Sequence, residues 1–310
     1  MNAEPTSSDR NGRAELLALT GELRGELHRY CARLMGSVID GEDVVQDTLA
    51  RALVALEEVE EEMPQLRPWL FKIAHNRALD LLRSRTIRKA EPIEAASEIA
   101  DEANPDPMEV LMRQEAVETA VSRFAELPLL QRSVIILKDV LDESLKDIAD
   151  LLDLTVDAVK AHLARGRARL REINAQAVTL SAARPPSAAT ARYVTLFNAQ
   201  NWDGLRALLA DDVRLHQSTY PARAGAAEVG MFFTIYAKFE GVRLQPAWVE
   251  GREVIAVFED SAGAKPSYFM WLEWQNGRIN FIRDYRYARY IVDDAELVLA
   301  PHGEAADGGG

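Results

Sequence analysis

The sequence predicts a multidomain fold in which two all-α helical domains are followed by an α+β domain. Three observations support this prediction. Apolar residues recur at helical spacing over 14–85 and again over 108–177, with Gly and Pro at the interruptions. Beyond the Pro-Pro pair at 185–186, one amphipathic helical segment at 191–200 precedes runs rich in Val, Ile, Phe, Tyr and Trp, which are typical of strands.

Two linker segments separate the three domains: the stretch 91–107 in the first has little helical periodicity, and Pro185-Pro186 interrupts the second. The segment 91–118 contains nine acidic residues and a single Arg, so it contributes −8 to the net charge of −13. Because much of the acidity lies in this segment, the net charge does not exclude a nucleic-acid partner for the helical domains. The predicted organisation is a first helical domain at 14–90, an acidic flexible linker at 91–118, a second helical domain at 119–177, a Pro-rich linker at 178–190, an α+β domain at 191–300 and a disordered tail at 301–310.

The composition excludes several classes of protein. No stretch approaches the ~18 uninterrupted apolar residues that span a bilayer, and the first thirty residues hold no hydrophobic signal-peptide core. Cys31 is the only cysteine, which excludes an intramolecular disulfide and fits a reducing compartment. We expect Cys31 to be a small buried apolar residue and the protein to be cytoplasmic, with no membrane partner.

The segment 144–171 predicts two helices joined by a short turn. Ser144, with Asp147 three residues later, forms a capping pair for the first helix, and Thr155 can cap the second. The apolar stripe of the first helix comprises Leu145, Ile148, Ala149 and Leu152. The apolar side of the second helix comprises Val156, Val159, Leu163, Gly166 and Leu170.

The opposite side of the second helix combines small and cationic residues. It carries Asp157, Ala161, Ala164, Arg165 and Ala168, flanked by Lys160 and Arg171. Small side chains let a helix axis approach a surface closely while long cations reach around it, which is what a helix in the major groove of DNA requires. The alternative is a solvated cationic helix in an ordinary helical bundle.

These residues also carry a family resemblance. The stretch "LPLLQRSVIILKDVLDESLKDIADLLDLTVDAVKAHLARGRARL", over about 127–171, resembles region four of extracytoplasmic-function sigma factors, which reads the −35 promoter element. The resemblance implies −35 contacts by Thr155, Asp157, Lys160, Ala161, Ala164, Arg165, Arg167 and Arg171. The sequence departs from the family pattern at His162, usually Arg, and at Gly166, usually Ala; we expect His162 to be a neutral surface residue.

Two upstream motifs resemble region two of the same family. "DGEDVVQDTLARAL" at 40–53 is similar to the helix that docks on RNA polymerase, which implies a polymerase interface formed by Asp43, Val44, Gln46, Asp47 and Arg51. "LRPWLFKIAHNRALDLLRSR" at 66–85 is similar to the helix that captures the −10 element, which implies DNA contacts by Lys72, His75, Asn76, Arg83 and Arg85. Trp69 lies on the apolar stripe of that helix, so we expect it in the core. The acidic segment 57–66 departs from a loop that should accept phosphates.

The C-terminal domain resembles the SnoaL-like (nuclear-transport-factor-2-like) α+β cone. The resemblance rests on "ARYVTLFNAQNWDGLRALLADDVRLHQ" and "PSYFMWLEWQNGRINFIRDYRYARY", and Asn276-Gly277 in the second stretch predicts a hairpin. Catalytic relatives line the cone with an Asp–His pair or with carboxylates, so the candidate pocket comprises His216, Trp271 and Asp284. Arg283 beside Asp284 could neutralise the carboxylate, in which case the pocket would not be catalytic.

The resulting expectation is a sigma factor that directs RNA polymerase to promoters and initiates transcription, with its activity modulated by the fused C-terminal domain. It implies core RNA polymerase and promoter DNA as partners, a small ligand or intramolecular regulation through the C-terminal domain, and no catalytic residue, metal or cofactor. One alternative is a different helix-turn-helix regulator, which would leave residues 40–85 unexplained. The other is an enzyme or small-molecule-binding protein that acts through the cone, with DNA binding secondary.

Overall fold

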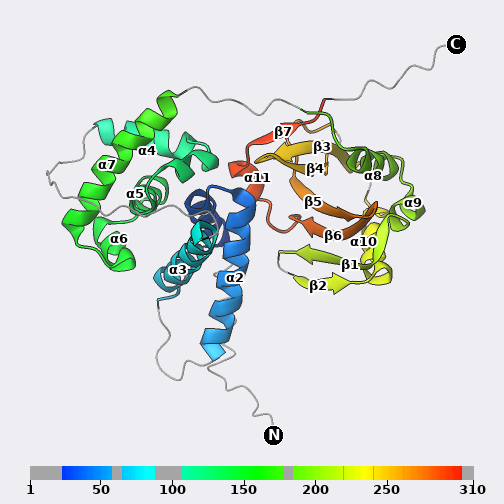
Figure 1. The fold of residues 1–310 in the computed structure, drawn as a ribbon, viewed down its shortest axis with the longest axis horizontal. Helices are drawn as coiled ribbons and strands as arrows, with labels where there is room; N and C mark the ends of the chain where they lie inside the picture. Colours follow the sequence, from blue (N-terminus) through cyan, green and yellow to red (C-terminus); the bar gives the residue numbers. More distant parts are fainter. Residues whose placement is uncertain are drawn as a thin grey trace, which may run out of the picture. The chain divides into compact units, whose positions relative to one another are not determined.

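The computed structural model describes residues 23–57, 65–87, 107–176 and 184–301, apart from positions 219, 240 and 261. The chain divides into two units at the boundary between Val178 and Thr179. The first unit contains both helical domains, and the second contains the α+β domain, called here the C-terminal domain. The fold class predicted from the sequence is confirmed (Figure 1).

The first helical domain consists of a helix over 23–35 and the helices α2 (Val38–Glu57) and α3 (Leu66–Ile87). A tight turn joins the first two helices. Gly36 has a φ of 70°, which an L side chain rarely adopts. Directly after it, the Ser37 hydroxyl accepts a hydrogen bond from the Asp40 amide and so caps α2. Cys31 is buried in this domain, as expected.

The second helical domain begins earlier than predicted. Its elements are α4 (Pro107–Glu118), the 3-10 helix η1 (Val121–Glu126), α5 (Leu129–Ile135), the π-helix η2 (Ile136–Val140), α6 (Leu145–Leu152) and α7 (Val156–Ala175). The expectation of a flexible linker throughout 91–118 is therefore wrong for 107–118, where α4 contacts η2. Ala116 is fully buried, and Arg113 pairs with Asp142 at 2.8 Å, so packing against the following helices orders this acidic segment. The remainder of the predicted linker, 91–106, lies outside the described residues.

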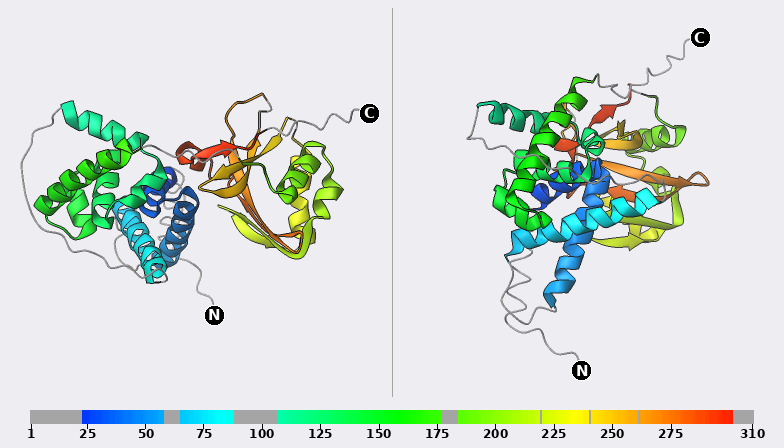
Figure 2. Two further views of the ribbon diagram at one scale, coloured as in Figure 1. Left: turned by 45° about the horizontal axis from the view of Figure 1, so that its top comes forward. Right: turned by 60° about the vertical axis from the view of Figure 1, so that its left-hand side comes forward.

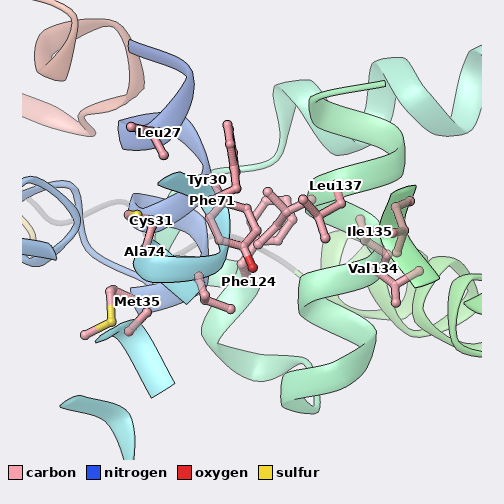
Figure 3. Packing of buried hydrophobic residues seen from close by; sticks show 14 of the residues in the cluster. Leu27, Tyr30, Cys31, Met35, Phe71, Ala74, Phe124, Val134, Ile135 and Leu137 are labelled. Carbon is pink, nitrogen blue, oxygen red and sulfur yellow. The ribbon is translucent and has the colours of Figure 1, made fainter. Parts of the chain in front are cut away.

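One hydrophobic core extends through both helical domains. Tyr30 and Phe71 from the first domain belong to the same buried cluster as Phe124 and Leu137 from the second. Figure 3 shows these side chains facing one another across the boundary between the two domains. Within the described residues of the first unit, the two domains therefore share packing and are not independent bodies.

The C-terminal domain is a seven-stranded sheet, and the helices between residues 188 and 236 lie against one face of it (Figures 1 and 2). Its helices are α8 (Ala188–Asn198), α9 (Trp202–Arg206), α10 (Ala226–Tyr236) and α11 (Ile291–Asp294). Its strands are β1 (Leu209–Gln217), β2 (Tyr220–Ala224), β3 (Arg243–Val249), β4 (Arg252–Phe258), β5 (Tyr268–Gln275), β6 (Arg278–Asp284) and β7 (Leu297–Leu299). The strand order is β2-β1-β6-β5-β4-β3-β7, and β1 and β6 pair in parallel.

Aromatic side chains fill the space between the helices and the sheet. Tyr193 on α8 packs against Phe233 on α10, and Phe197 on α8 contacts Tyr236 on α10. The predicted hairpin is confirmed, because Asn276 and Gly277 join β5 to β6 with φ angles of 52° and 76°. Among the described residues, no helix combines the length and the apolar character that a membrane span requires.

Candidate nucleic-acid interface

The two helices of the predicted helix-turn-helix begin at their expected caps. The Ser144 hydroxyl accepts a hydrogen bond from the Asp147 amide at 3.1 Å, and the Thr155 hydroxyl accepts one from the Ala158 amide at 3.1 Å. Asp153 ends α6 in the left-handed conformation, with a φ of 56°. Its amide donates to the Ala149 carbonyl, so the chain reverses direction within three residues.

The inner side of α7 packs against the second helical domain. Val159, Leu163, Gly166 and Leu170 are buried, as the apolar pattern predicted, whereas Val156 is 38% exposed. At Gly166 an added Cβ atom would lie 2.6 Å from Cδ1 of Ile135. Gly at this position therefore allows α7 to lie unusually close to α5.

The outer side of α7 is open among the described residues. Asp157, Ala164, Ala168 and Arg171 are exposed, and Ala161 is partly exposed. Lys160 lies 3.8 Å from Asp157, and no core contact covers the alanines. A face of small residues bordered by cations can therefore approach a duplex without rearrangement of this domain.

Arg167 departs from the expected set, because it turns inward. Its guanidinium donates to both carboxylate oxygens of Asp139, at 2.9 and 2.5 Å, and its side chain is only 14% exposed. This geometry makes Arg167 a link between α7 and η2, and the expected −35 contact by Arg167 is wrong for this conformation. Asp139 was not among the predicted residues; its place beside Lys138, in a run 134–141 that is otherwise apolar, was the available signal.

His162 is also withdrawn from solvent. The expectation of a surface residue is wrong, since His162 is 7% exposed. Burial, together with the positive charge of Arg165, lowers its pKa, so the neutral form expected from the sequence is favoured. The side chain is therefore part of the support of α7 and not of its open face.

The residues expected to contact the −10 element are divided by the structure. Asn76, Arg83 and Arg85 are exposed, with Arg85 paired to Asp40 at 2.8 Å. His75 is buried, and its Nδ1 shares a 2.7 Å hydrogen bond with the Tyr30 hydroxyl. The expected DNA contact by His75 is wrong for this conformation, because its ring belongs to the core of the first helical domain.

Lys72, the remaining member of that set, contacts the second helical domain. Its ammonium donates to the Leu151 carbonyl and to the Asp153 carboxylate, each at 2.7 Å. Trp69, one turn earlier on α3, is partly buried and packs against the shared core, as expected. The acidic stretch 58–64 that precedes α3 lies outside the described residues.

The residues expected to form a polymerase interface all lie on α2. Arg51 is exposed, while Asp43, Gln46 and Asp47 are partly exposed, with Asp47 accepting a 2.7 Å hydrogen bond from Arg77. Val44 has no exposed surface and belongs to the core. The expected interface role of Val44 is therefore wrong, because its side chain lies on the buried side of α2.

The candidate pocket in the C-terminal domain does not form from the three expected residues. The register pairs His216 with Arg283 and Gln217 with Asp284 across the parallel strands β1 and β6. On the other side of β6, Arg283 pairs with Trp271 of β5. Because successive side chains on a strand point to opposite faces, His216 and Trp271 share one face of the sheet and Asp284 lies on the other. The expected grouping is therefore wrong.

Asp284 lies in the aromatic core between the sheet and the helices. It is 1% exposed, and it accepts hydrogen bonds from the Gln217 side-chain amide at 2.8 Å and the Arg286 backbone amide at 3.0 Å. Burial raises the pKa of its carboxyl to about 6, against the opposing effect of these hydrogen bonds. Nearby, the hydroxyls of Tyr236 and Tyr268 share a 2.5 Å hydrogen bond.

The described residues contain no group of three or more His, Cys, Asp or Glu side chains that could hold a metal ion. The geometry of residues 144–175 is that of a helix-turn-helix protein. Two capped helices are joined by a three-residue turn, and the second helix has an open face of alanines and cations.

Known families match the three parts of the chain. Sigma-70 region 2 matches residues 19–87, Sigma-70, region 4 matches residues 119–170, and the SnoaL-like domain matches residues 190–281. The "ECF RNA polymerase sigma factor SigL" of Mycobacterium tuberculosis (strain ATCC 35801 / TMC 107 / Erdman) is 31% identical over 150 residues, which cover 48% of this chain and 83% of that relative. The chain belongs to the extracytoplasmic-function RNA polymerase sigma factors.

Two further relatives match longer parts of the chain. The "ECF RNA polymerase sigma factor SigG" of Mycobacterium tuberculosis (strain ATCC 25618 / H37Rv) is 33% identical over 218 residues, covering 62% of this chain; the chain spans 58% of that relative's length. The crystal structure of the Mycobacterium tuberculosis extracytoplasmic function sigma factor SigJ is 18% identical, with a TM-score of 0.34, and the match covers 89% of this chain and 98% of that one.

Proposed function

We propose that this protein binds core RNA polymerase in the cytoplasm and directs it to promoters that carry matching −35 and −10 elements. The observation that carries the proposal is the open outer face of α7, on which Ala161, Ala164 and Ala168 lie between Lys160, Arg165 and Arg171. Alanines at the centre let the helix enter the major groove at its N-terminal end, and the flanking cations reach phosphates. The membership of the sigma factor family supports the same reading.

In this proposal the first helical domain supplies the contacts to polymerase and to the −10 element. Asp43, Gln46, Asp47 and Arg51 present polar groups along α2, on the side that its buried residues leave open. Asn76, Arg83 and Arg85 present polar and cationic groups along α3. Cations beside a rigid helix suit the capture of a separated DNA strand, because its phosphates remain charged while its bases are unpaired.

The C-terminal domain acts in this proposal as a regulatory, non-catalytic part. A catalytic Asp–His pair needs both side chains within reach of one substrate, and His216 and Asp284 lie on opposite faces of the sheet. The carboxyl of Asp284 is enclosed among Tyr236, Tyr268 and Gln217. These contacts favour a structural role for Asp284 over acid–base chemistry.

A direct test combines the full chain with purified core polymerase and a promoter library randomised at both elements. We expect co-elution of the chain with core polymerase and enrichment of one sequence pair in the run-off transcripts. A chain that neither co-elutes nor enriches any promoter would disprove the proposal. Repeating the assay with residues 1–178 tests the regulatory role: identical promoter choice and transcript yield would show that the C-terminal domain does not regulate.

A further inference from the structure

The sheet of the C-terminal domain has an outer face, on the side away from α8 and α10. Asp284 lies on the inner side, where its charge acts on the hydroxyls of Tyr193 on α8 and Tyr236 on α10. Successive residues of a strand point to opposite faces, so the register of β1, β6, β5 and β4 identifies the residues that point outward. They are called here the aromatic face: Arg214, His216, Arg252, Trp271, Glu273, Phe281 and Arg283.

Two large aromatic rings lie at the centre of this face. Trp271 and Phe281 are on the neighbouring strands β5 and β6, with ring centroids 6.3 Å apart and planes 78° apart (Figure 1). The ring of His216 packs edge-on against Phe281, at 4.9 Å between centroids. All three rings are partly exposed, whereas Tyr193 and Phe233 on the inner side are fully buried. The outer rings therefore offer planar apolar surface that another planar group can cover.

Guanidinium groups border the two rings. The guanidinium carbon of Arg214 lies 5.9 Å from the centroid of Phe281, and that of Arg252 lies 5.5 Å from the centroid of Trp271. At these distances the positive charge is attracted by the ring and stays beside it. Each ring is therefore paired with a cation that can reach a charged group on whatever covers the ring.

The charge of the aromatic face is mainly positive. Arg283 lies between His216 and Trp271 in the register, and Glu273, opposite Phe281, supplies a carboxylate on the same face. Burial, and then the positive charges of Arg283 and Arg214, lower the pKa of His216. The three guanidinium groups thus outnumber the one carboxylate of the aromatic face, and the imidazole beside them is kept neutral.

An occupant of this face must supply both flat apolar surface and negative charge. An apolar partner would cover the rings but would leave desolvated guanidinium groups without a counter-charge, which costs free energy. An acidic peptide would supply carboxylates but few planar groups to stack on the rings. The bases of a duplex are already paired and stacked on one another, whereas a single strand exposes its bases and its phosphates together. Single-stranded nucleic acid therefore fits the chemistry of this face.

We propose that the aromatic face of the C-terminal domain binds single-stranded DNA. Successive bases stack on Trp271 and Phe281, whose crossed planes suit a strand with splayed bases, and the bordering guanidinium groups neutralise its phosphates. These interactions need no 2′-hydroxyl, and promoter opening in the proposed function supplies a separated DNA strand. The source of the strand rests on the proposed function, whereas the binding itself does not.

Binding is tested with the full chain and a fluorescein-labelled thymidine oligonucleotide of about 12 nucleotides, by fluorescence anisotropy. Trp271→Leu and Phe281→Leu each remove one stacking ring and should weaken binding by about 5- to 100-fold. Arg252 and Arg283 take part in further interactions, so the exposed Arg214 is the cation chosen for the test. Arg214→Gln should lower the slope of log Kd against log salt concentration by about 0.7, the value for one phosphate contact on a single strand.

Matched controls lie away from the aromatic face. Phe239→Leu replaces an exposed ring just after α10, and Arg206→Gln replaces a half-exposed cation at the end of α9. Both variants should bind the oligonucleotide as the unsubstituted chain does. Thermal unfolding checks that each variant is folded, and Arg214→Gln alters an exposed side chain that the fold does not require. An unchanged salt slope in Arg214→Gln, or equal losses in the control variants, would overturn the proposal.

The helical domains are also expected to bind DNA, so crosslinking locates the site. A thymidine oligonucleotide with one central 5-iodouracil is irradiated with the full chain, because this base crosslinks to an aromatic ring on which it stacks. Mass spectrometry of the peptides then identifies the residue. We expect crosslinks at Trp271 or Phe281. Crosslinks confined to residues 1–178 would overturn the proposal.

Competition against these crosslinks distinguishes the possible occupants. Unlabelled thymidine single strand should remove them at a lower concentration than the same sequence in a duplex, or than polyglutamate of equal charge. Equal competition by the duplex or by polyglutamate would show that the face responds to charge alone, and stronger competition by a uridine RNA would make RNA the occupant; either result would overturn the proposal. A chain that crosslinks here but does not co-elute with core polymerase would contradict only the proposed function.

Discussion

The guanidinium of Arg167 donates hydrogen bonds to both carboxylate oxygens of Asp139, and the carboxylate has no exposed surface. This pair joins the middle of α7 to the π-helix η2, and so helps to fix the orientation of α7 in the second helical domain. Two buried charges offset their lost hydration only while both are present, because either one alone would be left unpaired in a poorly hydrated site.

Removal of one member of this pair should therefore lower the free energy of unfolding. We expect Arg167→Ala to lower the free energy of unfolding by ~3–5 kcal/mol, as for other broken buried ion pairs. Arg169→Ala on the same helix, which removes an exposed pair with Glu172, should change it by at most ~1 kcal/mol. Chemical denaturation measures both. A double variant, Asp139→Leu with Arg167→Met, should lose less than Arg167→Ala; a larger loss would contradict the unpaired-charge explanation.

The open face of α7 predicts which cations bind promoter DNA. Arg165→Ala and Lys160→Ala should each weaken binding to a promoter with its −35 element by ~1–3 kcal/mol if the side chain contacts a base. Arg169→Ala is the control, since Arg169 bonds to Glu172 beside the proposed face. Fluorescence anisotropy with labelled promoter and polymerase holoenzyme measures the change. Unaltered affinity in both variants would remove α7 from the groove.

The buried ring of His75 predicts that the first helical domain loses stability in acid. Burial, with smaller effects from Lys72 and Arg83, lowers the pKa of His75 to about 4, below its ordinary value of about 6.5. Between these values the unfolded chain binds more protons, so the free energy of unfolding should fall as the pH decreases from about 6.5 towards about 4, by at most ~1.4 kcal/mol per pH unit.

His75→Gln should remove this pH dependence, because an amide can accept the hydrogen bond from Tyr30 without titrating. Labelling of the buried Cys31 thiol by a pyridyl disulfide, which reacts in acid, reports opening of this domain in the full chain. The labelling rate of the unsubstituted chain, divided by that of the His75→Gln variant, should rise as the pH decreases. A ratio that stays constant between pH 7 and 5 would show that His75 is not the group responsible.

Asp284 predicts the opposite pH dependence for the C-terminal domain. Burial raises the pKa of its carboxyl to about 6, so the folded domain binds more protons than the unfolded chain between about 4 and 6. The stability contributed by the protonated form is therefore lost as the pH rises through that interval. Asp284→Asn should flatten this dependence and raise the free energy of unfolding at pH 7.5, by up to ~3 kcal/mol.

The tryptophans at 202, 248, 271 and 274 lie in the C-terminal domain, so denaturation followed by fluorescence reports mainly this unit. Asp212→Asn, at an exposed position on β1, is the control and should change the free energy of unfolding by less than ~0.5 kcal/mol. A destabilised Asp284→Asn variant at pH 7.5 would mean that the ionised carboxylate, held by Gln217 and Arg286, stabilises the fold.

The sequence by itself determined the features that depend on neighbouring residues. The caps at Ser144 and Thr155, the buried stripe of α7 and the turn at Asn276-Gly277 all follow from side chains within about four positions of one another. The order of the domains, two helical blocks followed by an α+β block, was predicted from hydrophobic periodicity in the same way. Family motifs then supplied the expected roles of these elements.

Only the tertiary structure decided which polar side chains remain available. Arg167 is bound to Asp139, 28 positions away, and His75 to Tyr30, 45 positions away. Lys72 bonds to Asp153 from another domain, and the register of β1 and β6 separates His216 from Asp284. A cation or an imidazole has the same local pattern whether it faces DNA or a buried partner, because the energy that distinguishes the two comes from desolvation and from pairing with distant residues.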